Sequence, residues 1–349
     1  MKELTIVGYE QFGYLTDTLM YCRYLDGYRI HYYCIDQGLE HIELANVEVH
    51  YFRPYKNPKI TKVAFLLNIF LQHLFASHPV FIVYFPQCHI LRYLLGNQRV
   101  HLDIRTLCIS DDEEMKRLDL LKAQKAFRLF RSVSAISEGL AQKLHLKNYQ
   151  ILPLGADALS TQEKDYSQLR LLYVGTLSNR NIEQTIEGFS MYLDETGDKT
   201  ASYDIIGYGV NDEDEVIRSC ISRYKLQDRV RFHGRKKYAE LVPYFEKCNI
   251  GVSYIPIVDH FQNQPPTKTF EYIMSGLYCI ATQTNENAKI VNEENGVLIQ
   301  DSAASFNEAL KLTCQQSHSF DADRIRSTVN DFSWKKIVEQ KLKPIIDKL

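Results

Sequence analysis

Hydrophobic and polar positions along the chain follow one recurring pattern. Short runs of β-branched and aromatic residues alternate with segments of helical periodicity, which predicts an α/β fold with parallel sheets. In the first part the predicted strands cover residues 4–8, 29–35, 47–52, 80–85, 100–104, 132–136 and 150–152. Predicted helices there cover residues 58–76 and 112–130, and Ser137 is placed to cap the short helix that follows it.

A polar stretch over residues 153–168 interrupts the pattern, and the alternation then starts again. The predicted strands of the second part cover residues 169–174, 202–206, 230–233, 250–254, 278–281 and 297–299. The predicted helices cover residues 181–193, 212–224, 238–248, 267–275, 303–315 and 334–349, the last with Pro344 as a kink or break. We therefore expect two Rossmann-like domains, residues 1–160 and 161–330, with ligands bound at the carboxyl ends of their strands, and a C-terminal helix over 331–349.

Composition excludes several classes of protein. Of the 349 residues, 45% are hydrophobic and 24% are charged, as in ordinary globular proteins, so a disordered chain, a fibre and a small disulfide scaffold are excluded. The 41 Lys and Arg residues against 43 Asp and Glu residues give a net charge of −2. Without a general basic field, nucleic acid is not an expected partner.

Cysteine usage and the apolar segments bear on the compartment. None of the eight cysteines forms a CxxC or metal-ligand spacing, so they are expected to be reduced core thiols of a cytoplasmic protein. The first residues resemble a strand rather than a signal peptide. The most apolar run, residues 63–76, is too short to cross a bilayer; a helix of the domain is the main interpretation, and contact with a membrane surface is the alternative.

The first candidate binding segment covers residues 264–276. After Pro265 and Pro266 a helix can begin, and its free N–H groups and positive dipole end suit a phosphate. Lys268 adds a cation beside Thr267, and Glu271 lies one turn further on the same face, where it could accept hydrogen bonds from ribose hydroxyls. The alternative is a surface helix with a Lys–Glu pair.

Two glycine-containing strand ends are further candidates. Gly175 lets the backbone approach a ligand, and Thr176 and Arg180 can donate to phosphate oxygens. Gly207 and Tyr208 end the next predicted strand, where the tyrosine ring could stack on a base. Taken alone, each segment is better explained as an ordinary turn at the end of a strand.

The first domain offers one cluster of ionisable residues. Alternation along the predicted strand 100–104 places His101, Asp103 and Arg105 on one side, where they could handle protons or anions. The alternative is a salt-bridged strand end. The sequence shows no array of metal ligands and no Ser/His/Asp motif, so we expect neither a metal nor a cofactor.

The order of motifs in the second part resembles a known family. It is similar to the retaining glycosyltransferases of GT-B fold, in particular glycosyltransferase family 4 of the "group 1" type, through nearly all of residues 169–316. The motifs are LLYVGTL (171–177), IIGYG (205–209), VRFHG (230–234), LVPYFEKCNIGVS (241–253), PTKTFEYIMSG (266–276) and NGVLI (295–299). Residues 133–140 and 151–157 look like the family's last strand, helix and strand before the linker.

The resemblance implies a nucleotide-sugar donor bound by the second domain, an acceptor bound by the first, and chemistry between them. Glu271 matches the second Glu of the family's E-x7-E motif, which holds the donor ribose, and Arg180 lies near the family's diphosphate-binding Lys. The first Glu of that motif is replaced by Asn263, so the donor sugar would meet this amide or Asp259. Thr176 stands where the family usually has Arg. The helix over 331–349 looks like the family's segment that crosses back onto the first domain.

The expected reaction follows from this resemblance. A hexosyl group would pass, with retention of configuration, from a nucleoside diphosphate sugar, expected to be a UDP-sugar, to a glycan or lipid-linked acceptor. Arg180, Lys268 and the helix start at Thr267 would neutralise the leaving diphosphate without a metal. Asp103 or His101 would orient the acceptor hydroxyl. A sugar-nucleotide epimerase and a catalytically silent sugar- or nucleotide-binding module remain alternatives. We expect the protein to be cytoplasmic, with peripheral contact with the inner face of the membrane as a further option.

Overall fold

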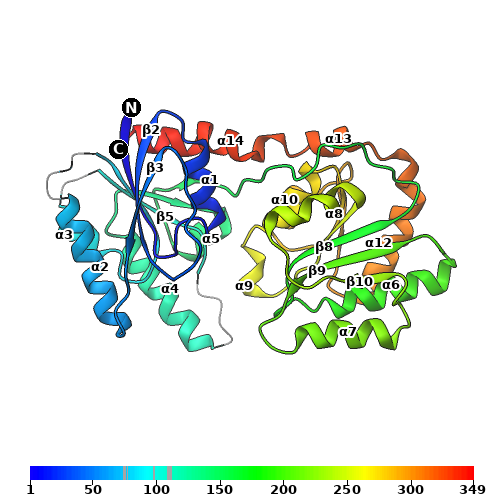
Figure 1. Ribbon diagram of the computed structural model, residues 1–349. Helices are drawn as coiled ribbons and strands as arrows, with labels where there is room; N and C mark the ends of the chain where they lie inside the picture. The colour runs from blue at the N-terminus through cyan, green and yellow to red at the C-terminus, as the bar shows by residue number, and fades with distance from the viewer. Residues whose placement is uncertain (74–75, 77, 97–98, 108–111) are drawn as a thin grey trace. The chain divides into compact units, whose positions relative to one another are not determined.

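The computed structural model describes residues 1–73, 76, 78–96, 99–107 and 112–349. The chain forms two compact α/β units, shown in Figure 1. Unit 1 consists of Met1–Gly155 together with Trp334–Leu349, and unit 2 consists of Ala156–Ser333. The chain thus passes into unit 2 at Ala156, a few residues before the expected position, and returns to unit 1 at Trp334.

Unit 1 is built on a seven-stranded sheet in the order β3-β2-β1-β4-β5-β6-β7, with every pair parallel. Its strands are β1 (Lys2–Val7), β2 (Tyr28–Ile35), β3 (Val47–Phe52), β4 (Val80–Val83), β5 (Val100–Ile104), β6 (Ser132–Ala135) and β7 (Gln150–Ile151). The crossovers from β1 run outward on both sides. This is the doubly wound order expected from strands that alternate with helices.

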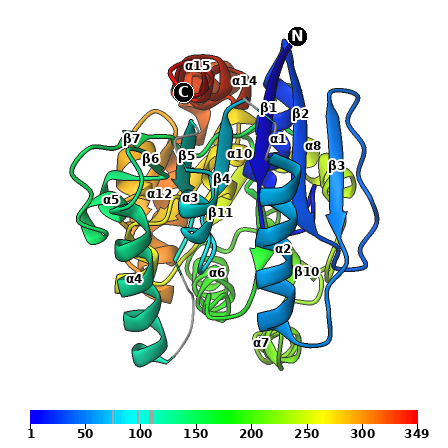
Figure 2. The same cartoon turned by 90° about the vertical axis from the view of Figure 1, so that its left-hand side faces the viewer.

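Helices cover both faces of this sheet. They are α1 (Thr16–Tyr24), α2 (Pro58–His73), α3 (Ile90–Leu94), α4 (Glu113–Phe127) and α5 (Glu138–Lys143). Tyr32 of β2 donates a hydrogen bond to Thr18 of α1, whereas the ring of the next residue, Tyr33, packs edge-on against His73 of α2. Since neighbouring strand residues point to opposite faces, α1 and α2 lie on opposite sides of the sheet; Figure 2 shows α2 in front of the strands.

The C-terminal segment completes unit 1 as one nearly continuous helix: α14 (Trp334–Ile337), a π-helical turn η4 (Val338–Leu342) and α15 (Lys343–Asp347). The indole of Trp334, which is 1% exposed, packs edge-on against the ring of Tyr21 in α1. Pro344 lies in the first turn of α15 and has no N–H to donate, so the hydrogen-bond pattern changes here, but the helical segment continues where the sequence predicts a kink or break.

Unit 2 has a six-stranded parallel sheet in the order β10-β9-β8-β11-β12-β13. The strands are β8 (Arg170–Thr176), β9 (Ser202–Tyr208), β10 (Val230–Phe232), β11 (Ile250–Ser253), β12 (Tyr278–Thr282) and β13 (Gly296–Ile299). The strand order reverses between β8 and β11. In open α/β sheets this reversal is where ligands bind, beyond the carboxyl ends of the strands.

The helices of unit 2 connect these strands. They are α6 (Glu183–Thr196), α7 (Glu213–Arg223), η1 (Tyr238–Leu241), α8 (Val242–Lys247), α9 (Asp259–Gln262), α10 (Thr267–Met274), α11 (Asn287–Ile290), α12 (Ala303–Gln316), η2 (Ser317–Ser319), α13 (Ala322–Ser327) and η3 (Asn330–Phe332). Across the described part of the chain, none of the helices combines the length and apolar character needed to cross a membrane.

Tyrosine supplies a large share of the cores. Of the 23 tyrosines, several are fully buried, and some of their hydroxyl groups are hydrogen-bonded inside the protein. Tyr203 shares a hydrogen bond with Thr185 at 3.0 Å, and the hydroxyl of Tyr272 accepts the backbone N–H of Val174 at 2.7 Å. A buried tyrosine thus fills space and also ties a strand to a helix.

The predicted α/β class with parallel sheets is confirmed, and the Ser137 cap is present, with its hydroxyl accepting the N–H of Leu140 at 3.2 Å. Helices α1 and α3 were not predicted, because both are short and α1 lacks a regular apolar stripe. The predicted helix over 58–76 is described as far as His73; residues 74 and 75 lie outside the described residues.

Candidate functional site

The candidate site of unit 2 lies at the strand-order reversal. Strand β8 ends at Gly175 and Thr176, and helix α10 begins at Thr267 in the segment that follows β11. A side-chain carbon placed on Gly175 would be 3.5 Å from Lys268 Nζ and 3.3 Å from the Tyr173 hydroxyl oxygen. The end of β8 and the first turn of α10 therefore meet, and Gly175 leaves room between them for a ligand.

Among the described residues Lys268 has no salt-bridge partner, and other contacts hold it in place. Its Nζ lies 4.1 Å from the centroid of the Tyr173 ring, a cation–π contact. Burial lowers the pKa of Lys268 well below its ordinary value, and the positive charge of Arg180 lowers it further. No carboxylate is among the described groups that shift this pKa. An arriving anion would therefore relieve an unfavourable accumulation of positive charge.

Arg180 supplies the second cation. Its guanidinium carbon lies 4.0 Å from the centroid of the Phe261 ring in α9, and burial lowers its pKa. The flanking residues Asn179 and Asn181 both have left-handed backbone, with φ of 55° and 52°. This sharp turn after β8 directs Arg180 toward α9, and its charge reaches Lys268.

Glu271 lies one turn into α10. Burial raises its pKa to about 7, and the nearby negative charge of Asp157 adds to the rise. The hydroxyl of Tyr238 in η1 donates to Glu271 Oε1 at 3.4 Å, which partly offsets it. Glu271 is half-buried at the edge of the site. Its carboxyl group is therefore near its titration point at neutral pH.

The second glycine has a structural explanation. A side-chain carbon on Gly207 would lie 2.1 Å from the carbonyl oxygen of Gly175, its partner in the neighbouring strand. Gly207 is thus required by the pairing of β8 with β9, whatever else it contacts. Beside it, Tyr208 is 42% exposed, and the Arg235 guanidinium lies 4.5 Å from its ring centroid, so the ring offers a flat surface with a cation on it.

The residues expected near the donor sugar lie on α9 and just after it. Asp259 is the first residue of α9, and Asn263 is the residue that ends it. The Asn263 Oδ1 accepts a hydrogen bond from the Asn285 side chain at 3.2 Å, so this amide already joins two loops. Contact of either residue with a sugar stays a prediction.

The cluster of unit 1 differs from its prediction. His101 and Asp103 have no exposed surface and Arg105 is 4% exposed, so these side chains cannot touch an acceptor where they lie. They belong to a buried chain of polar groups on β5, β6 and α1. His101 bonds Ser134 Oγ at 2.8 Å, and that hydroxyl donates to Asp103 at 2.5 Å.

Asp17 of α1 completes this buried chain, and no motif in the sequence points to it. Arg105 Nε donates to the Asp17 carboxylate at 2.5 Å, and Arg105 Nη1 donates to the Leu152 carbonyl at 2.6 Å. Burial lowers the pKa of His101 to about 3 and raises that of Asp103 to about 6. The alternation of residues on β5 correctly predicted that His101, Asp103 and Arg105 share one side of the strand, but α1 covers that side. The prediction that they orient an acceptor is therefore wrong, and their role is structural.

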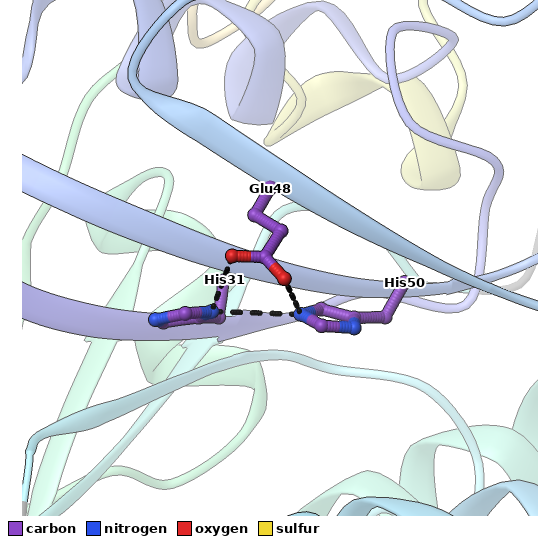
Figure 3. Close-up of side chains that lie close together, drawn as sticks. All are labelled: His31, Glu48 and His50. Atoms are coloured by element: carbon purple, nitrogen blue, oxygen red, sulfur yellow. Dashed lines mark hydrogen bonds and ion pairs between the residues drawn. The ribbon is translucent and has the colours of Figure 1, made fainter.

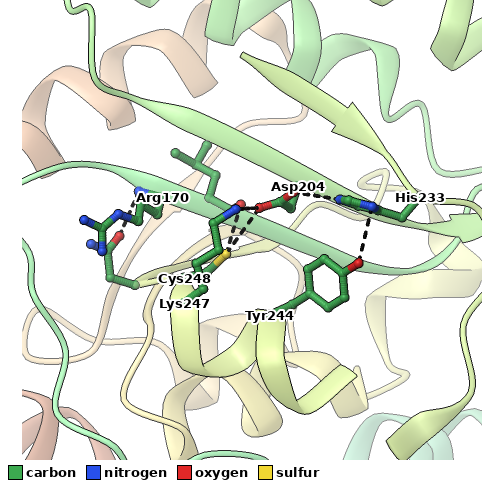
Figure 4. A network of polar contacts seen from close by, with 8 residues as sticks. Arg170, Asp204, His233, Tyr244, Lys247 and Cys248 are labelled. Atoms are coloured by element: carbon green, nitrogen blue, oxygen red, sulfur yellow. Dashed lines mark hydrogen bonds and ion pairs between the residues drawn. The ribbon is translucent and has the colours of Figure 1, made fainter. Parts of the chain in front are cut away.

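A further polar network, this one in unit 2, was also not predicted from the sequence (Figure 4). The buried carboxylate of Asp204 in β9 accepts hydrogen bonds from His233 Nε2 at 2.7 Å and from Lys247 Nζ at 2.8 Å. Tyr244 contacts the other nitrogen of His233 at 3.3 Å. These bonds join β9, α8 and the residue after β10, which explains the histidine of the VRFHG motif as a structural group.

The family comparison concerns the part of the chain that holds this site. Residues 168–315 match the model of the family described as Glycosyl transferases group 1. This match covers the strand-order reversal, Gly175, Arg180, Lys268 and Glu271, and it confirms the resemblance seen in the sequence. The matched residues all lie in unit 2, which is therefore similar to a Glycosyl transferases group 1 domain.

Solved structures share the fold over the whole chain. Sucrose-phosphate synthase from Thermosynechococcus elongatus matches at a TM-score of 0.76 and 13% identity, covering 100% of this chain and 99% of its own. HepE from Anabaena in complex with UDP and glucose matches at 0.76 and 13%, covering 100% of both chains. The lipopolysaccharide outer core galactosyltransferase WaaB, in its apo form, matches at 0.71 and 14%, also covering 100% of both. No curated protein matches the sequence significantly. The GT-B fold is thereby confirmed.

Proposed function

We propose that this protein transfers a hexosyl group from a nucleoside diphosphate sugar, with UDP as the nucleotide, to a glycan or lipid-linked saccharide with retention of configuration. The observation that carries this proposal is the pair of cations Lys268 and Arg180 beside Gly175, with Glu271 one turn further along α10. Three of the similar structures are of HepE with UDP, with UDP and glucose, or with UDP-glucose, which supports the choice of nucleotide.

In this proposal the diphosphate lies against Gly175, Thr176 and the first turn of α10 at Thr267. Lys268 and Arg180 neutralise the charge that develops when the bond between the anomeric carbon and the β-phosphate oxygen breaks. The acceptor oxygen then forms the new bond to that carbon, and its proton leaves with the diphosphate or solvent. Two protein cations perform the neutralisation, so we propose that transfer needs no metal ion and no cofactor. Glu271 accepts hydrogen bonds from the ribose hydroxyls, and the Tyr208 ring stacks on the base.

The donor sugar would contact Asn263 or Asp259, and unit 1 would bind the acceptor. An amide in place of the acidic residue keeps a hydrogen-bond acceptor and adds an N–H group that can donate. Binding of the nucleotide sugar is therefore retained. A sugar-nucleotide epimerase or a silent binding module would share this donor site, and the experiment below distinguishes the three.

Substitution of Lys268 tests the donor site. Lys268→Met keeps much of the length of the side chain but removes its charge, so a charge-assisted contact worth about 1.5–3 kcal/mol is lost. We expect UDP affinity, measured by titration calorimetry with EDTA present, to fall roughly 10- to 100-fold. The matched control is Lys199→Met, an exposed lysine of the same unit, which should bind UDP like the wild type.

Equal UDP binding by K268M and the wild type would show that the donor site is misplaced. Because the pKa of Glu271 is raised to about 7, wild-type affinity should also fall as the pH drops from 8 to 6, and Glu271→Gln should lack this dependence. Product analysis by NMR separates the alternatives. A glycosidic product that appears only with acceptor indicates transfer, and an isomerised donor without acceptor indicates epimerisation. Neither product, with UDP, GDP, ADP or CMP sugars bound weakly or not at all, indicates a silent module.

We also propose that unit 1 contacts the inner face of the membrane in the cytoplasm. Helix α2 is apolar on two sides: Phe65 and Ile69 are buried toward the sheet, whereas an outer stripe is exposed. That stripe consists of Ile60, Val63, Leu67 and Leu71, which are 49–63% exposed. Lys56 and Lys59 lie exposed at its start. Apolar side chains with adjacent lysines fit an anionic lipid surface, which suits an enzyme with a lipid-linked acceptor.

A further inference from the structure

Strand register gathers three metal-binding side chains on the outer part of the sheet in unit 1. His31 of β2 is paired directly with Glu48 of β3, and His50 follows Glu48 by two residues. Since side chains two apart on a strand share a face, and directly paired residues also share one, all three side chains lie on the same side. This is the face covered further along by α2, opposite to the face covered by α1.

The donor atoms of the three side chains converge (Figure 3). His31 Nδ1 and His50 Nε2 are 3.5 Å apart. Glu48 Oε2 lies 3.6 Å from His31 Nδ1, and Glu48 Oε1 lies 3.8 Å from His50 Nε2. Two ligands bound to Zn²⁺ at about 2.0–2.1 Å with tetrahedral angles lie about 3.3 Å apart. Small rotations of these side chains therefore suffice to bring all three to bonding distance of one ion.

Neighbouring groups hold the ligands in place. The His50 ring stacks on Tyr33 with centroids 4.4 Å apart, and the His31 ring stacks on His78 at 5.5 Å. Arg29 Nη2 donates to Glu48 Oε2 at 3.0 Å, which leaves Oε1, on the side of His50, for a cation. A carboxylate that binds a metal through one oxygen while the other is hydrogen-bonded is a common arrangement around metal sites.

We propose that His31, Glu48 and His50 form a binding site for Zn²⁺ or a similar divalent transition metal, separate from the donor site. Two imidazoles and one carboxylate suit this class of ion, and the partly exposed carboxylate leaves a fourth position for water. The ion joins β2 to β3, and β3 is the edge strand of the sheet. Its expected effect is therefore to fix this edge, and it takes no part in sugar transfer.

Direct measurement of metal binding tests this proposal on the full-length protein. The exposed thiol of Cys314 is first removed as Cys314→Ser, because it could bind Zn²⁺ by itself. Titration of this background with Zn²⁺ against a chromophoric chelator should show one saturable site per chain. His50→Gln and Glu48→Gln should each weaken that site at least tenfold, as is usual when one of a few ligands is lost. His318→Gln, an exposed histidine of unit 2, should leave it unchanged.

Hydrogen exchange gives a second readout that is independent of activity. Saturating Zn²⁺ should slow the exchange of backbone amides in Val47–Phe52, and E48Q should abolish this slowing while its circular dichroism spectrum stays that of the wild type. Three results would overturn the proposal: no saturable site, equal weakening by H318Q and H50Q, or binding without added protection of β3. Each of these outcomes leaves UDP binding by unit 2 unaffected.

Discussion

At the scale of single residues, the buried groups of β5 show how a polar cluster far from solvent is kept in the fold. His101 has no exposed surface, and among the described residues its ring nitrogens form hydrogen bonds with serine hydroxyls alone. The neutral ring is therefore favoured. Asp103 is equally buried, and its carboxyl group shares the Ser134 hydroxyl with His101. Acidification acts on the two residues in opposite directions.

The signs of these two effects lead to a prediction. The pKa of His101 is lowered from 6.5 to about 3, so the unfolded chain takes up the proton first and stability falls as the pH drops. The pKa of Asp103 is raised from 3.8 to about 6, so the folded chain takes up the proton first and stability rises. Between pH 7 and pH 5, His101 alone removes about 2 kcal/mol and Asp103 returns about 1.4 kcal/mol.

Asp103→Asn should therefore make the protein more acid-sensitive. Over the same pH range its unfolding free energy, measured with urea, should fall by about 1.4 kcal/mol more than that of the wild type. Asp194→Asn, on the exposed side of α6, is the control and should follow the wild type. Parallel pH curves for D103N and the wild type would mean that Asp103 titrates normally.

The donor-site residues and those of unit 1 depend on the sequence in different ways. The positions of Lys268 and Glu271 follow from the start of a helix and its period, and the structure places Lys268 beside Gly175, whereas their contact with a donor stays a prediction. The burial of His101 depends instead on α1, whose Asp17 is distant in the sequence. Alternation tells which side of a strand a residue takes, but it does not tell what covers that side.

At the scale of elements, strand register carries information that spacing along the chain does not. His31 and Glu48 are separated by 17 positions, so no metal-ligand motif is visible, yet β2 and β3 pair them directly. Helix bounds were predicted to within a few residues where a proline or glycine marks them, as at Pro266 and Gly276 around α10. Short helices without a regular apolar stripe, such as α1, were not.

The exposed stripe of α2 gives the prediction at this scale. Val63→Asp and Leu67→Asp together place two charges on the outer side of the helix without touching its buried side. We expect this variant to lose cosedimentation with anionic lipid vesicles while its UDP affinity stays that of the wild type. The control is Asp194→Asn in unit 2. Unchanged vesicle binding by the double variant would exclude α2 as the membrane-contacting surface.

At the scale of the whole molecule, two sheets share the same doubly wound order around β1 and β8, and the alternation of predicted strands and helices was sufficient to expect both. The chain is nevertheless not divided into two consecutive halves, because its last residues return to unit 1. An amphipathic pattern shows that the final helix needs a partner, and the family resemblance supplies the expectation that this partner is the first domain.

Trp334 tests this return of the chain. Trp334→Ala removes a fully buried ring that packs on Tyr21, so we expect unit 1 to lose about 3–5 kcal/mol of stability. Hydrogen exchange should show the loss of protection in residues 1–155, with unit 2 unaffected. Lys335→Ala, which changes an exposed neighbour, should have little effect. Loss of protection confined to residues 156–333 would contradict the assignment of this segment.

The two passages between the units meet at one place. The N–H of Ala156 donates to the carbonyl of Phe332 at 2.9 Å, and Ala156 forms a parallel bridge with Ser333. The first and last residues of unit 2 are therefore neighbours, and unit 2 is in topological terms an insertion into unit 1. Residues 156–333 could be excised as one continuous piece, and the same adjacency would let that piece be closed into a ring and reopened at another loop.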